Sequence, residues 1–142
     1  MQTDLERAKA ELRAGDWSLV LVKEGRVAAR TSGPGLRELL ALAGSLGDTA
    51  RGASLADRVV GRAAALVALA MGIRAVYTPL LSEGGRRVLE ESAIDLVYER
   101  VVPMILNRSG EGQCPMERLV EGMRDPHEAL SALRAWKPPA PV

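Results

Sequence analysis

The sequence predicts a three-layer α/β domain, with a mixed sheet that opens on a β-hairpin and carries helices on both faces. A chain of 142 residues is long enough for one domain with a sizeable core. Its hydrophobic fraction of 47% and charged fraction of 26% are those of an ordinary globular protein. Helix-like and strand-like patterns also alternate along it. We therefore expect a single domain over residues 1–135 and a disordered tail over residues 136–142.

The first part of the chain predicts a helix, a hairpin and a second helix. In DLERAKAELRA, apolar residues recur at helical spacing, and a Gly-Asp pair ends the segment. The next two segments have strand composition and are separated by the turn-forming residues KEG. The elements expected here are a helix at 4–14, strands at 18–22 and 26–31, and an amphipathic helix at 36–46.

Residues 54–72 predict a long central helix. Ser54-x-x-Asp57 fits a capping box, in which Ser54 is the N-cap and Asp57 bonds back to the Ser54 N–H. The run RAAALVALAM is apolar nearly all round, which is typical of a buried helix. Gly72 then closes the helix. We therefore expect this helix to run from about Leu55 to Met71.

Helix-like and strand-like segments also alternate in the rest of the chain. Asp125, Pro126 and Glu128 form a further N-terminal helix signal, because they match the preferences of the N-cap, first-turn and capping-box positions. The expected elements are a strand at 73–81, a helix at 82–93, one bent strand or two short strands within 94–108, and helices at 114–123 and 125–136.

Composition disfavours several classes of partner. The formal net charge is +1, and the only aromatic residues are two tryptophans and two tyrosines, so neither a basic face nor a stacking platform for nucleic acid is expected. The longest uncharged apolar run, residues 63–73, is shorter than the roughly 20 residues that span a bilayer. A single cysteine and an N-terminus without signal-peptide features favour a cytoplasmic protein.

Two segments carry a family resemblance. ADRVVGRAAALVALAMGIRAVYTPLLSEGG and LNRSGEGQCPMERLV resemble the uncharacterised domain-of-unknown-function family 1893, within the cytidine-deaminase-like fold. DRVVGRAAA and CPMER are the most specific parts, and the resemblance covers residues 15–130. It implies a deaminase-like scaffold, without implying an activity.

Zinc deaminases need a His or Cys and two further Cys on the metal, together with a Glu that acts as general acid and base. The resemblance places Leu55 at the histidine position and Asp57 at the glutamate position, and it places Ser82 and Gly85 at the two cysteine positions. The chain has one Cys and one His in total, so it cannot supply this ligand set. We therefore expect no metal and no cofactor.

Cys114 is the first candidate for a chemical role. It precedes Pro115, a favoured first helical residue, and unpaired N–H groups at a helix start stabilise a thiolate. Glu117, three residues later, opposes that effect if its carboxylate lies near the sulfur. Two interpretations stay open: Cys114 is a reactive thiol, or it is only a small residue at the helix start.

Other candidates also have two interpretations. Asp57 could be a general base or an orienting carboxylate, or it could only complete the capping box. Arg58 and Arg62, four residues apart on the expected helix, could bind a phosphate or carboxylate, or could form a solvated stripe. Glu117 is a further candidate for ligand binding. Residues Ser82, Glu83 and Gly84 lie between a strand and a helix, where ligands collect in open sheets, although they also suit a simple helix entry.

We favour a deaminase-like protein without zinc that binds a small, nucleotide-like ligand, with Cys114 as the reactive group and Asp57 as the acid/base or orienting group. The alternative is a non-catalytic ligand-binding or regulatory protein-interaction module with a structural cysteine. A homodimer is compatible with either hypothesis.

Overall fold

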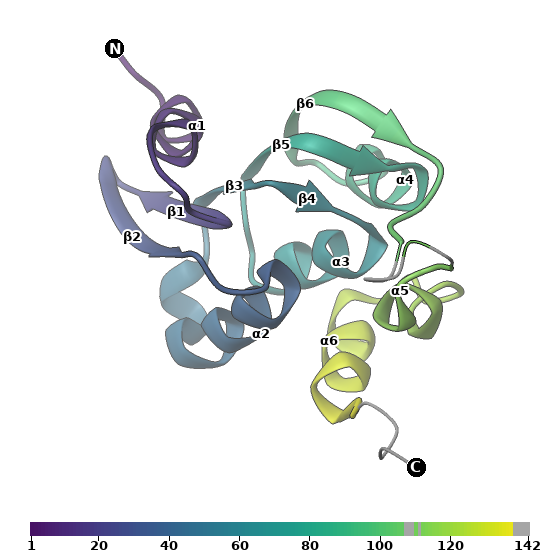
Figure 1. The fold of residues 1–142 in the computed structure, drawn as a ribbon. Helices are drawn as coiled ribbons and strands as arrows, with labels where there is room; N and C mark the ends of the chain where they lie inside the picture. Colours follow the sequence, from purple (N-terminus) through teal and green to yellow (C-terminus); the bar gives the residue numbers. More distant parts are fainter. Residues whose placement is uncertain (107–109, 111, 138–142) are drawn as a thin grey trace.

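The computed structural model describes residues 1–106, 110 and 112–137. Its centre is an open, mixed six-stranded sheet (Figure 1). The strands are β1 (Leu19–Lys23), β2 (Arg26–Thr31), β3 (Ser54–Asp57), β4 (Val59–Val60), β5 (Ala75–Ser82) and β6 (Asp95–Val102). The helices are α1 (Asp4–Ala14), α2 (Gly35–Leu46), α3 (Arg62–Ala70), α4 (Glu83–Glu90), α5 (Pro115–Leu119) and α6 (Pro126–Ala135), with a short 3₁₀ turn η1 (Gly47–Ala50).

The sheet joins an antiparallel hairpin to a parallel half. β1 pairs antiparallel with β2 and with β3, whereas β5 pairs parallel with β3, β4 and β6. β3 and β4 lie along the same neighbour, β5, and are separated only by Arg58, so together they form one interrupted strand. The expected mixed sheet opening on a hairpin is therefore confirmed.

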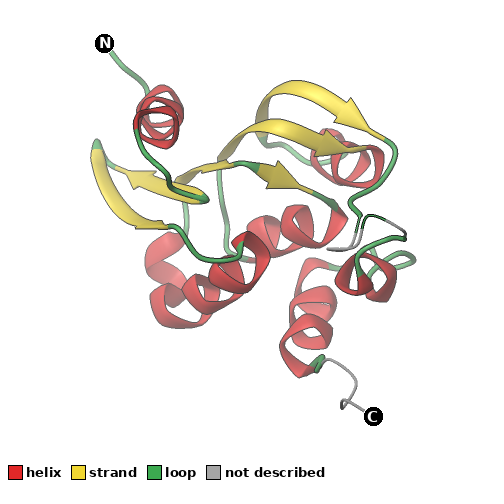
Figure 2. Cartoon of the chain, in the orientation of Figure 1, coloured by secondary structure: helices red, strands yellow, loops and turns green. Residues whose placement is uncertain are grey.

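Helices cover both faces of the sheet (Figure 2). On one face, Ala8 and Leu12 of α1 pack in a small cluster with Val20, Val22 and Tyr77. On the other face, α2, α3, α4 and α6 share a larger aliphatic core, whose buried members include Leu39, Leu66, Leu89 and Leu133. This arrangement is the three-layer α/β architecture that the sequence predicts.

The first elements match their predicted ranges because local signals define them. Thr3 and Glu6 form a capping box at the start of α1, and the helix spans the expected residues 4–14. Glu24 and Gly25 both have positive φ, at 52° and 77°, as a two-residue hairpin turn requires. Asp4 accepts hydrogen bonds from both of these turn N–H groups, at 3.0 and 2.9 Å, and so ties α1 to the hairpin.

The predicted central helix is wrong over its first turns. Residues Ser54–Asp57 form strand β3, and α3 begins at Arg62 with Gly61 as its N-cap. Ser54 and Asp57 therefore form no capping box. β3 lies between β1 and β5 and is buried along its whole length. A strand buried on both faces shows no alternation of polar and apolar residues, so its sequence resembles the start of a buried helix.

Within the described residues 94–106 there is one strand, β6, which ends at Val102 before Pro103. The last two residues of the predicted range, 107 and 108, lie outside the described residues. α5 is shorter than the predicted helix at 114–123, and α6 ends at Ala135 with Asp125 as its N-cap, as expected. In the described part of the chain, no helix has the length and hydropathy needed to cross a membrane.

Candidate functional site

A pocket of about 220 Å³ lies where β3 ends. In open α/β sheets this carboxyl end of the strands is where ligands usually bind. Apolar side chains from α2, β4, α3 and the segment after β6 form much of its wall. They are Leu36, Val59, Ala64 and Ile105. Four polar residues that the sequence singles out separately line the same pocket, namely Asp57, Arg58, Cys114 and Glu117.

Asp57 is the last residue of β3, and only 2% of it is exposed. Its Oδ1 accepts a long hydrogen bond of 3.3 Å from the Val59 N–H. Its Oδ2 is fully buried and has no hydrogen-bond partner among the described residues. Burial raises the pKa of Asp57 from 3.8 to about 7, and the backbone N–H groups of Val59 and Arg58 only partly offset this effect. A carboxyl that exchanges its proton near neutral pH therefore lines the pocket.

Glu117 is buried too, but its carboxylate is well paired. Its two oxygens accept hydrogen bonds from the backbone N–H groups of Arg62, at 2.8 Å, and Ala63, at 2.7 Å. These are free donors at the start of α3, so α5 supplies a cap for a helix more than fifty residues earlier in the chain. Burial raises the pKa of Glu117, while the two N–H groups and the charge of Arg62 lower it.

Two glycines allow the helix starts and this carboxylate to approach one another. A Cβ at Gly61 would lie 1.9 Å from Glu117 Oε1, so a larger residue would displace the Glu117 side chain. A Cβ at Gly85, on α4, would lie 3.0 Å from the carbonyl carbon and oxygen of Gly61. The N-terminal ends of α3 and α4 are therefore in close contact, with Glu117 capping α3.

The expected Arg58–Arg62 helix face does not exist, because Arg58 lies between β3 and β4 whereas Arg62 begins α3. Arg58 Nη2 donates to the carbonyl oxygens of Leu12 and Gly15, both at 2.8 Å. Arg62 Nε donates to the Val120 carbonyl oxygen at 3.1 Å, and its Nη2 donates to that of Met123. Both side chains thus bind backbone carbonyls, and an anion-binding role for either stays a prediction.

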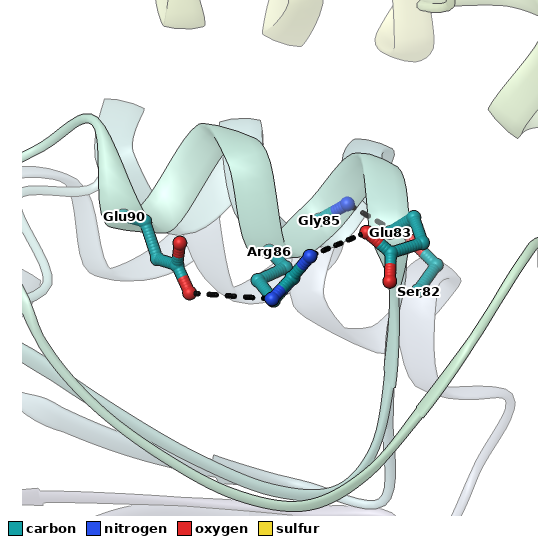
Figure 3. A network of polar contacts seen from close by, with 5 residues as sticks. All are labelled: Ser82, Glu83, Gly85, Arg86 and Glu90. Atoms are coloured by element: carbon teal, nitrogen blue, oxygen red, sulfur yellow. Dashed lines mark hydrogen bonds and ion pairs between the residues drawn. The ribbon is translucent and has the colours of Figure 1, made fainter.

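Ser82, Glu83 and Gly84 form the predicted entry from β5 into α4 (Figure 3). The Ser82 Oγ accepts the Gly85 N–H at 2.9 Å and so caps α4, while Glu83 pairs with Arg86 at 2.8 Å. Together with Arg62 and Glu117, the three residues line a separate and more polar pocket of about 290 Å³. Glu117 therefore lies at both pockets, and ligand binding by Ser82, Glu83 or Gly84 remains untested.

Cys114 is the N-cap residue of the five-residue helix α5 and is half-buried. Its backbone N–H donates to the Ile105 carbonyl oxygen at 2.9 Å, and its side chain makes no capping hydrogen bond. Among the described residues the thiol therefore caps no N–H at the helix start, and Cys114 lines the pocket that contains Asp57.

The structure also changes which residues correspond to the metal-site positions of a zinc deaminase. Leu55 and Asp57 lie on a strand, so they do not occupy the start of a helix as the resemblance implied. That start is at Gly61–Ala63, where the Glu117 carboxylate lies. Within residues 1–106, 110 and 112–137, no group of three or more His, Cys, Asp or Glu side chains is arranged to hold a metal ion.

The fold and this pocket define an α/β domain with two buried acidic groups, one at the end of β3 and one on α5. The profile of a family described as "TM1506: Domain of unknown function (DUF1893)" matches residues 7–136, so the chain belongs to this family. It is similar to the crystal structure of TM1506, a DUF1893 family protein from Thermotoga maritima, with a TM-score of 0.84 and 25% identity. That match covers 95% of this chain and 91% of the other. No curated protein matches the sequence.

Proposed function

We propose that this protein binds a small molecule in the Asp57 pocket, with Asp57 as the group that exchanges a hydrogen bond or proton with the ligand. The observation that carries the proposal is Asp57 Oδ2, which is buried without a partner and belongs to a pocket-lining residue. An unsatisfied buried polar group costs about 1–3 kcal/mol, and more when it is charged. Such costly, pKa-shifted groups concentrate at functional sites.

The size of the pocket supports a small ligand. Pockets for drug-sized molecules usually measure about 300–1,000 Å³, whereas this one measures about 220 Å³. A single flat ring with its substituents is a suitable size. If the ligand is nucleotide-like, the pocket takes its heterocycle, and the rest of the molecule extends outside.

The sheet order supports a deaminase-like scaffold as part of the same proposal. An antiparallel hairpin leads into parallel strands, and α3 and α4 begin where β4 and β5 end. The resemblance to deaminases places metal ligands at two helix starts. Here the carboxylate of Glu117 lies at the start of α3. This supports a deaminase-like scaffold in which a protein carboxylate lies where the metal site of a deaminase would be.

The proposal gives Cys114 the role of the nucleophilic side chain of the pocket, because its thiol has no capping function and lines the same pocket as Asp57. Its alkylation therefore provides a second measure of occupancy. A ligand that fills the pocket is expected to slow the reaction of Cys114 with iodoacetamide, since the thiol and the ligand compete for the same space.

The test is a screen of small neutral, cationic and anionic fragments, followed in ¹H–¹⁵N spectra of the full chain. We expect at least one fragment to shift the amide signals of Arg58, Val59 and Gly61 saturably and to slow alkylation of Cys114. The control is Ala64→Leu, which adds a larger side chain to the pocket wall and should abolish both effects in a protein whose spectrum is otherwise folded. If no fragment shifts these signals, the proposal is wrong.

A second candidate function is self-association through β6, an edge strand that pairs only with β5 among the described strands. Apart from Met1, every exposed large hydrophobic residue of the described chain lies on β4, on β6 or just after β6. They are Val59, Val97, Tyr98, Met104 and Leu106. A second copy suits this edge, because an antiparallel β6 would bring its Glu99 and Arg100 next to Arg100 and Glu99 of the first copy.

Sedimentation equilibrium tests this candidate. We expect a dimer for the wild type and a monomer for Val97→Lys, because a lysine on an edge strand opposes strand pairing. Ala28→Lys is the matched control, since Ala28 is exposed on β2 at the opposite edge of the sheet, and it should leave the dimer intact. A wild type that stays monomeric at all concentrations, or equal dissociation by both variants, contradicts self-association through β6.

A further inference from the structure

The charges at the Asp57 pocket indicate the class of ligand. Asp57 and Glu117 both line it, and each is at least nine-tenths buried. Among the described residues, Arg58 is the only basic residue of the lining, and its guanidinium donates to the carbonyl oxygens of Trp17, Leu12 and Gly15 near the end of α1. The Ser18 hydroxyl is also engaged, since it donates to the Thr31 carbonyl oxygen at 2.9 Å. Within the described part of the chain, an entering anion would therefore meet two acidic groups and no free cation.

The two carboxyl groups differ in what they offer a ligand. Both oxygens of Glu117 already accept hydrogen bonds from backbone N–H groups. Glu117 therefore contributes negative charge to the pocket, but its oxygens are already paired with protein donors. Asp57 has its Oδ2 free of any partner in the described chain. This oxygen is buried, so the carboxyl group must turn slightly toward the pocket to meet a ligand N–H, and that bond would then remove the cost of leaving it unsatisfied. An acceptor group of the ligand would gain nothing from an ionised Asp57.

The remainder of the lining suits a flat apolar body. Leu36, Val59, Ala64 and Ile105 present only hydrocarbon, so a ring can be buried against them while its polar end meets Asp57. Hydrogen bonds between a carboxylate and a cationic, planar N–H group are about twice as strong as neutral ones. A molecule with an apolar ring and a planar cationic end satisfies both parts of the lining.

From this geometry we infer that the pocket selects small molecules with an amidine, guanidine or protonated amino-heterocycle group directed at the Asp57 carboxyl group, and that it rejects carboxylates and phosphates of similar size. This inference rests on the proposed function. For a nucleotide-like ligand, it means that the heterocycle would bind in the pocket and that any phosphate would have to lie outside it.

Benzamidine and benzoate provide a matched test, because they share ring and shape and differ in the sign of the charge. We expect benzamidine to shift the amide signals of Arg58 and Val59 saturably, and benzoate to leave them unchanged at ten times the concentration. Asp57→Asn should weaken benzamidine binding at least tenfold. Asp48→Asn, which neutralises a fully exposed carboxylate, should leave it unchanged.

The pH profile is a second measurement. Because Asp57 loses its proton near pH 7, binding of benzamidine should strengthen from pH 6 to pH 8 in the wild type and stay constant in Asp57→Asn. Equal or tighter binding of benzoate, or benzamidine binding that survives Asp57→Asn, overturns the inference. If neutral fragments bind the pocket but benzamidine does not, the charge preference is wrong and the proposed function stands. If no fragment of any charge binds, both are wrong.

Discussion

Asp57 at the end of β3 and Glu117 on α5 are two buried carboxyl groups at one pocket, and they differ in what surrounds their oxygens. Glu117 accepts two short hydrogen bonds, at 2.8 and 2.7 Å, from the start of α3. Asp57 accepts one long bond of 3.3 Å from Val59 and leaves Oδ2 without a partner among the described residues. The two carboxyl groups are thus buried to a similar extent but differ in their hydrogen bonding.

This difference is the reason for proposing a structural role for Glu117 and a ligand-binding role for Asp57. The carboxylate of Glu117 satisfies backbone donors that would otherwise be buried without partners, so it stabilises the contact of α5 with α3. Asp57 has no comparable structural role, because the cost of its burial is not offset by hydrogen bonds. Groups of this kind lower stability and persist where function needs them. We therefore expect the two residues to respond in opposite ways to substitution.

The largest expected effect is the pH dependence of stability that Asp57 contributes. Its pKa is about 7 in the folded protein and 3.8 in the unfolded chain. The folded state therefore binds the proton more tightly, and this contribution to the unfolding free energy is present below pH 3.8 and is lost as pH rises to about 7. A shift of this size corresponds to about 4 kcal/mol.

Urea unfolding of the wild type and Asp57→Asn across pH 4–8 measures this contribution. The wild type should lose stability relative to Asp57→Asn by up to about 4 kcal/mol over that range, because only the wild type must bury a charge at high pH. Other titrating groups cancel in the difference between the two proteins. Asp48→Asn should follow the wild type. A difference that does not change with pH would show that the pKa of Asp57 is the same in the folded and unfolded states.

A smaller effect of opposite sign is expected for Glu117. Glu117→Gln keeps the shape of the side chain but turns an amide NH₂ toward one of the two backbone donors, so it should destabilise the protein by about 1–3 kcal/mol at neutral pH. Urea unfolding measures this loss, and hydrogen exchange of the Arg62 and Ala63 amides should become faster. Glu121→Gln is the control, since Glu121 is exposed on the turn after α5 and should change stability by less than about 0.5 kcal/mol. Equal stability of both variants would remove the contrast with Asp57.

Elements defined by neighbouring residues could be predicted from the sequence, and those defined by distant contacts could not. The capped start of α6 at Asp125 and the hairpin turn at Gly25 depend on side chains within a few positions. The segment 54–57 carries the same kind of local signal, Ser-x-x-Asp before an apolar run, and yet it is a strand. Its pairing with β1 and β5 on either side outweighs the weak local preference for a helix.

The candidate site likewise has features that the sequence could predict and features that it could not. By itself the sequence determined that the chain cannot supply the His/Cys/Cys ligands of a zinc deaminase, because it contains one cysteine and one histidine. It also indicated Asp57, Cys114 and Glu117 individually. Only the tertiary structure decided that these three line one pocket, that Glu117 is paired with α3, and that Asp57 is not paired. The physical reason is that burial and hydrogen-bond satisfaction depend on chain segments far apart in sequence, which no local pattern encodes.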